Sequence, residues 1–177
     1  SDSQLVIEAV FEDRDLKSEV IQKTRSVVSS DTTFASNTST LPISSLASSY
    51  SNPENFIGLH FFSPENRMQL VEIIVGEKTS DATLCSAMDF VQQIGKTPII
   101  VNDSRGFYTS RVFGTYVQEG LSLLADGVRP ALIENVGRLA GMPVGPLAVA
   151  DEVSLQLIRQ VAFQSKSDLG DLYVAPP

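Results

Sequence analysis

The residues best suited to acid–base chemistry are the single histidine, His60, and a carboxylate that follows it, Glu72. Both stand in apolar segments, 57–62 and 69–75, whose composition predicts β-strands. If these strands pair as a hairpin, His60 lies opposite Leu70 and diagonal to Glu72, on the same face of the sheet. A carboxylate beside an imidazole fixes its tautomer and stabilises the imidazolium, so the pair predicts a general base that works near neutral pH.

The same two residues also have an ordinary structural interpretation. A lone histidine among apolar neighbours is more often packed in a core than catalytic, and Glu72 could lie on a solvated face of its strand. However, a carboxylate between Val71 and Ile73 is costly to bury without a partner, and an imidazole is a suitable one. Spacing alone leaves the catalytic and the structural interpretation open.

A second polar cluster, 36–40 (SNTST), follows a strand predicted at 33–36. In α/β proteins ligands bind beyond the carboxyl ends of parallel strands, so small hydroxyl side chains at such a place predict a ligand site. Serine, asparagine and threonine also favour turns and helix caps. The cluster by itself does not separate these two interpretations.

Two further segments place polar groups at the ends of predicted elements. Glu8 and Glu12 come at the end of a strand predicted at 4–10, and Lys17 follows them. An acidic residue there suits a ribose hydroxyl, and a solvated loop explains it equally well. The segment 103–111 contains a glycine and predicts the start of a helix, whose N-terminus suits a polar ligand or is merely a helix start.

Apolar periodicity predicts the elements that must position these side chains. The serine-rich segment 26–51 also contains regularly placed apolar residues, which favours ordered turns over a solvated linker. Strands followed by helices predict an α/β domain at 1–103 and an all-α domain at 104–177. The expected strands are 4–10, 33–36, 57–62, 69–75 and 98–101. The expected helices are 16–28 (capped by Asp15), a helix capped by Thr79 or Ser80 and ended by Gly95, 107–125, 130–140 and 149–163.

Composition limits the class of protein. The chain has 177 residues, 42% of them hydrophobic and 19% charged, as in globular proteins. A formal net charge of −8 without a basic run argues against a nucleic-acid partner. No apolar stretch approaches the ~18 residues of a membrane-spanning helix. The single cysteine, Cys85, excludes an internal disulfide, and its place on the apolar face of a predicted helix predicts a core position.

Several segments together resemble conserved blocks of the 3-hydroxyacyl-CoA dehydrogenase family, in the family's order: VIEAVFED, FASNTSTLPI, IGLHFFSPENRMQLVEII, GKTPIIVNDSRGFYTSRV and AGMPVGPLAVADEV. The sequences of these blocks most resemble the dehydrogenase region of multifunctional fatty-acid β-oxidation enzymes of the alpha-subunit type. The resemblance implies the later part of a Rossmann-like NAD-binding domain at 1–103 and part of the family's helical C-terminal domain at 104–177. It also implies an oxidoreductase that converts (S)-3-hydroxyacyl-CoA to 3-ketoacyl-CoA with NAD as cofactor.

The resemblance also implies roles for single residues. His60 matches the catalytic histidine, Glu72 its carboxylate partner, and Ser39 a serine that contacts both the substrate oxygen and the nicotinamide. Ser63 and Ser110 stand where many members have asparagines, the first touching NAD and the second touching the acyl region of the substrate. Serine still donates a hydrogen bond, but it is shorter and offers fewer partners than asparagine.

The first matching block implies the cofactor site, with Val10, Phe11 and Glu12 along NAD and Lys17 near it. The family's opening strand, glycine-rich turn and helix have no counterpart in the sequence, nor do its last helices. This departure predicts a fragment. It also gives an alternative to an active enzyme, namely a catalytically incompetent fragment that serves only as a substrate-binding or assembly module.

The other expectations concern substrate, partners and location. A dehydrogenase for a different hydroxy acid is a further enzymatic alternative, although such families usually use a lysine where this chain has His60. The resemblance implies a homodimer or a thiolase subunit as protein partner. The net charge and the absence of a long apolar stretch predict no nucleic-acid partner and no integral membrane segment, and we expect a location in the bacterial cytoplasm.

Overall fold

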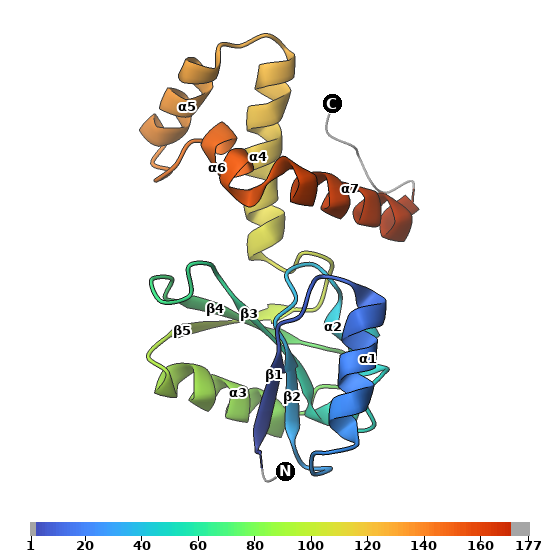
Figure 1. Ribbon diagram of the computed structural model, residues 1–177. Coiled ribbons are helices and arrows are strands. Elements are labelled where there is room, and N and C mark those ends of the chain that lie inside the picture. The colour runs from blue at the N-terminus through green and yellow to red at the C-terminus, as the bar shows by residue number, and fades with distance from the viewer. Residues whose placement is uncertain (1–2, 171–177) are drawn as a thin grey trace. The chain divides into compact units, whose positions relative to one another are not determined.

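A computed structural model describes residues 3–170 (Figure 1). The chain forms two compact units that divide between Tyr108 and Thr109. We expected the boundary between 103 and 104, five residues before the observed one. The connection 103–108 belongs to the first unit, because it is hydrogen-bonded to it through the Asp103 carboxylate and the backbone N–H groups of Gly106 and Tyr108. No helix among the described residues is long and apolar enough to cross a membrane.

The first unit is built on a sheet of five strands in the order β1-β2-β3-β4-β5. Only the β3–β4 pair is antiparallel, and the other neighbours are parallel. The carboxyl ends of β1, β2 and β3 therefore meet at one edge of the sheet. The bounds are β1 Leu5–Glu8, β2 Thr33–Ser36, β3 Phe56–Phe61, β4 Leu70–Val75 and β5 Thr97–Asn102.

Helices cover both faces of this sheet, α1 and α2 on one side and α3 on the other (Figure 1). Asp13 caps α1 by accepting from the N–H of Leu16, so the helix begins earlier than the expected cap, Asp15, implies. Ser80, one of the two residues expected to cap this helix, caps α3 by accepting from the N–H of Thr83. The bounds are α1 Arg14–Arg25, α2 Ile43–Ala47, a 3-10 turn at Pro53–Asn55, and α3 Asp81–Gln93.

The core of the first unit lies on the two faces of the sheet. Phe34 and Phe56 pack under α1 and α2, with ring centroids 5.4 Å apart, and Ile57 and Ile73 pack under α3. The serine-rich segment is ordered as predicted, since it contains β2 and α2. The prediction for Cys85 is wrong, because α3 turns this side chain to solvent while other positions of the helix face the sheet.

The second unit consists of helices α4–α7. Its core is formed by Val117 of α4 and by Val149 and Ala150 of α6. The prediction of one helix at 149–163 is wrong: Ser154, with φ of 78°, separates α6 from α7, and α6 begins at Pro146. The bounds are α4 Thr109–Ala125, α5 Pro130–Leu139, α6 Pro146–Val153 and α7 Leu155–Leu169.

Candidate active site

His60 of β3 and Glu72 of β4 form a buried hydrogen bond, with 2.7 Å between His60 Nδ1 and Glu72 Oε2. The two residues are direct partners in the ladder. The predicted register, with His60 opposite Leu70, is therefore wrong by two residues, because the connection between the strands is longer than assumed. A shift of two residues preserves the face on which each side chain lies, so the prediction of a shared face holds.

Glu72 is completely buried, and both of its carboxylate oxygens accept hydrogen bonds. Oε1 accepts from the backbone N–H of Tyr108 at 3.1 Å, and Oε2 faces the imidazole. The ring of Phe107, itself buried and with φ of 49°, lies 6.0 Å from the His60 ring. The connection after β5 therefore encloses the carboxylate and limits its motion.

The second ring nitrogen of His60, Nε2, is the atom open to a ligand. Among residues 3–170, every buried side-chain nitrogen or oxygen has a hydrogen-bond partner, and the structure gives Nε2 none. Nε2 therefore belongs to the 5% of the His60 surface that is exposed. An ionised Glu72 at Nδ1 favours the tautomer with the proton on Nδ1. Nε2 then carries the lone pair and can accept a proton.

The polar turn after β2 is held by Glu12. Its Oε1 atom accepts from the backbone N–H groups of Ser39 at 3.0 Å and Thr40 at 2.8 Å, and from the hydroxyls of Thr38 and Thr40. Both threonines are buried, whereas Ser39 is exposed. The turn follows the carboxyl end of β2, so its exposed serine lies where a parallel sheet binds ligands.

Glu8 and Lys17 form a buried cluster behind this turn. Lys17 Nζ is completely buried and lies 3.1 and 3.0 Å from the two oxygens of Glu8 and 3.0 Å from the carbonyl of Val10. Glu8 also accepts from the hydroxyl of Ser36 and the N–H of Val10. Glu8 is thus neither in a solvated loop nor turned outward to a ribose, and Lys17 would have to exchange a protein oxygen to contact a ligand directly.

The remaining predicted site residues occupy different settings. Phe11 is 65% exposed, Val10 is half-buried, and Ser63 is exposed and donates to Glu65 at 3.3 Å. Ser110 is a half-buried residue in the first turn of α4, in the second unit. The structure therefore brings His60 and Glu72 together and places Ser39 at the carboxyl edge of the same sheet.

Sequence reasoning missed three groups that hold these loops. Asn37 Oδ1 accepts from the N–H of Phe61, one residue beyond His60, at 2.9 Å. Asp103 accepts from Ile43 and from the next N–H of α2, both at 2.8 Å, instead of starting a helix as expected for 103–111. The third is the Tyr108 N–H on Glu72. Asn37 and Asp103 directly follow strands, and that position was an available signal.

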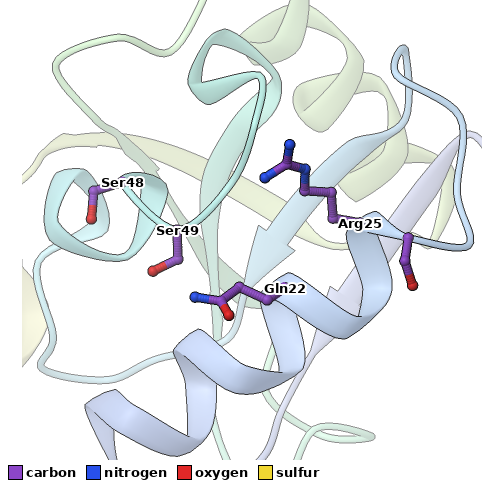
Figure 2. Close-up of a pocket in the computed structure, with 5 residues that line it drawn as sticks. Gln22, Arg25, Ser48 and Ser49 are labelled. Carbon is purple, nitrogen blue, oxygen red and sulfur yellow. The ribbon is translucent and has the colours of Figure 1, made fainter.

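A hollow of 420 Å³ lies elsewhere, between the C-terminal ends of α1 and α2, where Figure 2 shows Gln22, Arg25, Ser48 and Ser49. The hydroxyl of Ser48 donates to a carbonyl of its own helix, at 2.7 Å. Helix C-termini carry partial negative charge, which opposes an anion beside Arg25. In the described part of the chain, no group of three or more His, Cys, Asp or Glu side chains could hold a metal ion.

The fold and the site together define a class of protein. A sheet with helices on both faces binds nucleotides beyond the carboxyl ends of its parallel strands, and here the imidazole–carboxylate pair stands beside that edge. Phe11 and Ser39, which follow the carboxyl ends of β1 and β2, are both exposed. This arrangement is that of a Rossmann-type oxidoreductase.

Comparison with protein families agrees with this class. Residues 1–104 match the NAD binding domain of 3-hydroxyacyl-CoA dehydrogenase, and residues 106–177 match its C-terminal domain. The chain belongs to the 3-hydroxyacyl-CoA dehydrogenase family, whose members are NAD-dependent oxidoreductases. The resemblance and the fold class predicted from the sequence are thereby confirmed.

Individual relatives show the same relationship. The fatty acid oxidation complex subunit alpha of Shewanella frigidimarina is 41% identical over 175 residues, which cover 99% of this chain and 25% of that protein. The chain thus spans a quarter of the length of this curated relative. The (S)-3-hydroxybutyryl-CoA dehydrogenase of Ralstonia eutropha is 36% identical with a TM-score of 0.90, over 95% of this chain and 60% of that one. A diketoreductase is 29% identical with a TM-score of 0.84, over 91% and 58%.

Proposed function

We propose that the protein carrying this chain oxidises (S)-3-hydroxyacyl-CoA to 3-ketoacyl-CoA in fatty-acid β-oxidation, with His60 as the general base. The observation that carries this proposal is the 2.7 Å contact between His60 Nδ1 and the buried Glu72 carboxylate, in a chain of this family. A base needs an accessible lone pair and an orienting partner on its other nitrogen, and His60 has both.

In this mechanism His60 Nε2 accepts the proton of the substrate's 3-hydroxyl. The Glu72 carboxylate stabilises the resulting imidazolium and holds the ring in place through Nδ1. The Ser39 hydroxyl holds the reacting oxygen, which becomes the 3-keto oxygen. Bound NAD would supply the acceptor for the hydride that leaves C3. Ser110 contacts the acyl region of the substrate.

The residues proposed to bind NAD come from the carboxyl ends of the strands. Phe11 and Val10 supply apolar surface, Ser63 and Ser39 supply hydroxyls, and Glu12 belongs to the segment that lies along NAD. The 3.6 Å between Lys17 Nζ and Glu12 Oε2 supports a role for Lys17 behind this surface.

The test is the reduction of acetoacetyl-CoA by NADH in the full-length protein. His60→Gln is expected to lower kcat by about 10²- to 10⁴-fold, the range for loss of a positioned base. Gln93→Ala, an exposed position on α3, is the control and should retain wild-type kcat. Near-normal turnover by His60→Gln would show that the base is another group.

One observation favours a second candidate substrate class. The diketoreductase named above has a similar structure, and an imidazole–carboxylate pair serves any secondary alcohol. The two candidates differ in their dependence on the CoA group. A higher kcat/KM for 3-hydroxybutyryl-CoA than for free 3-hydroxybutyrate supports the acyl-CoA substrate, and equal values favour the second candidate.

We also propose that the protein works with a partner subunit in the bacterial cytoplasm. Its Shewanella relatives are named alpha subunits of a fatty acid oxidation complex, which supports a second subunit as partner. The family resemblance implies that this subunit is a thiolase, with a homodimer as the alternative. The exposed apolar side chains of Leu132, Val136 and Leu139 on α5 support an interface on the helical unit. Light scattering of the full-length protein, alone and with the thiolase, tests this, and a lone monomer in both cases contradicts it.

A further inference from the structure

One carboxylate oxygen of Glu12 accepts four hydrogen bonds from the turn 38–40. Its Oε1 lies 2.6 Å from the Thr38 hydroxyl, 3.0 Å from the Ser39 N–H, 2.8 Å from the Thr40 N–H and 3.0 Å from the Thr40 hydroxyl. All four donors belong to three successive residues. A single carboxylate oxygen therefore fixes the backbone on both sides of Ser39.

The side chains of this turn differ in burial and in whether they contact Glu12. Thr38 is completely buried and Thr40 is 8% exposed, and both direct their hydroxyls to Glu12. Ser39 contributes its N–H to Glu12 and is itself exposed. Its hydroxyl makes no hydrogen bond to protein within residues 3–170, so it is the one hydroxyl of the turn open to a ligand.

The ammonium group of Lys17 is hydrogen-bonded to Glu8 and lies farther from Glu12. The ammonium group of Lys17 lies close to both oxygens of Glu8 and to the Val10 carbonyl, and stands 3.6 Å from Glu12 Oε2. The direct hydrogen-bond donors of Glu12 are thus the backbone and hydroxyls of 38–40. Hydrogen bonds from neutral donors to an ionised carboxylate are stronger than those between neutral groups, so this carboxylate is a firm anchor for the turn.

We propose that Glu12 is the positioning residue for Ser39, acting through the 38–40 turn. It places the Ser39 hydroxyl at the carboxyl edge of the sheet, where the proposed function requires a donor to the reacting oxygen. The inference rests on that proposed function for its catalytic consequence, whereas the contact itself is independent of any reaction. Glu12 affects turnover by holding Ser39, and this distinguishes it from a residue that acts only by binding the cofactor.

The first test measures the turn without any activity. Hydrogen–deuterium exchange of the full-length protein is followed in peptides covering 37–41, for Glu12→Ala and Glu12→Gln. Exchange at 39 and 40 is expected to accelerate in Glu12→Ala, by about 10-fold or more at 39, because the Ser39 N–H loses its acceptor and the Thr40 N–H keeps only the longer contact of 3.4 Å to the Thr38 hydroxyl. Glu12→Gln retains one acceptor oxygen, so its exchange rates should lie between those of Glu12→Ala and those of the wild type.

Glu19→Gln is the matched control, since Glu19 is an exposed carboxylate on α1 that pairs with Lys23, one turn further along the helix, at 2.5 Å. It should leave exchange at 37–41 unchanged. Unchanged exchange in Glu12→Ala would overturn the proposal, because the turn would then be held by other contacts.

The second test is a double-mutant cycle on kcat for acetoacetyl-CoA reduction. Glu12→Gln is expected to lower kcat by about 10- to 100-fold in the wild type and by less than about 3-fold in Ser39→Ala, since the group it positions is then absent. Equal losses in the two backgrounds would overturn the proposal. So would a loss that appears only as weaker NADH binding. If the wild type lacks the activity, the proposed function fails, and the exchange result still decides whether Glu12 holds the turn.

Discussion

Glu72 in the sheet unit and Glu134 in the helical unit both accept backbone N–H groups, but among the described residues only Glu72 is also hydrogen-bonded to a titratable side chain. Glu134 Oε1 accepts from Leu147 at 2.8 Å and from Ala148 at 3.2 Å, at the start of α6. Glu72 accepts from Tyr108 with one oxygen and contacts His60 with the other.

The difference shows how the same chemical group serves structure in one unit and chemistry in the other. Glu134 caps a helix whose first residue is Pro146, and its charge suits the positive end of the helix dipole. Glu72 lies inside a sheet, where an unpartnered carboxylate is costly, and the imidazole is the partner that makes its burial tolerable. A carboxylate is therefore informative about function when its second partner can itself gain and lose a proton.

The largest expected effect comes from Glu72→Gln. The amide retains an acceptor for Tyr108 but cannot stabilise an imidazolium, so kcat for acetoacetyl-CoA reduction should fall by about 10²-fold or more. Glu77→Gln is the matched control, because Glu77 is an exposed carboxylate just after β4. Comparable kcat values for the two variants would mean that Glu72 does not act on the base and, like Glu134, is purely structural.

The next largest effect is expected in the helical unit, for Gly120→Ala. A Cβ at this position of α4 would lie 2.5 Å from Cβ and Cγ of Pro146. Alanine favours a helix by about 1 kcal/mol over glycine. Overlap with a rigid ring on a neighbouring helix costs about 1–3 kcal/mol, so the net effect is a loss of stability.

Gly114→Ala in the same helix is the control, because nothing lies within 4 Å of its added Cβ. It should stabilise the chain by about 1 kcal/mol through helix propensity alone. Urea unfolding followed by circular dichroism measures both variants. Equal changes in the two would show that α4 and α6 are not packed closely at Gly120.

The two units also differ in how far the sequence predicts them. The strands of the first unit follow from their apolar runs, and β2 was predicted with the observed bounds, 33–36. The shared face of His60 and Glu72 also followed, because period-two alternation survives an error of two residues in register. The register itself could not be predicted, since it depends on the conformation of the connection between the strands.

The contacts that complete the site were out of reach for a different reason. Glu72 accepts from the backbone N–H of Tyr108. Every residue except proline carries this group, so no residue type in the sequence indicates the contact. The break at Ser154 lies between segments that are both helical in pattern, so periodicity alone joined them. Local patterns thus predict elements, whereas contacts between distant segments depend on the packed fold.

Glu134→Gln is expected to have a smaller effect than Gly120→Ala. The amide oxygen still accepts from Leu147 and Ala148, but the favourable charge at the start of α6 is lost, at a cost of about 0.5–1 kcal/mol. Activity should be unchanged, in contrast to Glu72→Gln. A loss of kcat as large as that of Glu72→Gln would mean that Glu134 is not purely structural.

The smallest effect is a shift in the titration of Tyr116. Burial, with a further contribution from the Glu134 carboxylate, raises the pKa of the Tyr116 phenol above its ordinary value of 10.0. The folded chain therefore binds this proton more tightly than the unfolded chain. The corresponding stability is present below pH 10.0 and is lost as the pH rises through the raised pKa.

Tyr50 in the sheet unit provides the comparison, because its pKa is raised by burial alone. Phenolate absorbance of the wild type minus that of Tyr116→Phe isolates the Tyr116 titration, and Tyr50→Phe isolates the other. Glu134→Gln removes a neighbouring negative charge, so the Tyr116 midpoint should move down while the Tyr50 midpoint stays in place. Equal movement of both midpoints would mean that the variant loosens the whole chain, and that Glu134 acts on Tyr116 through packing rather than through its charge.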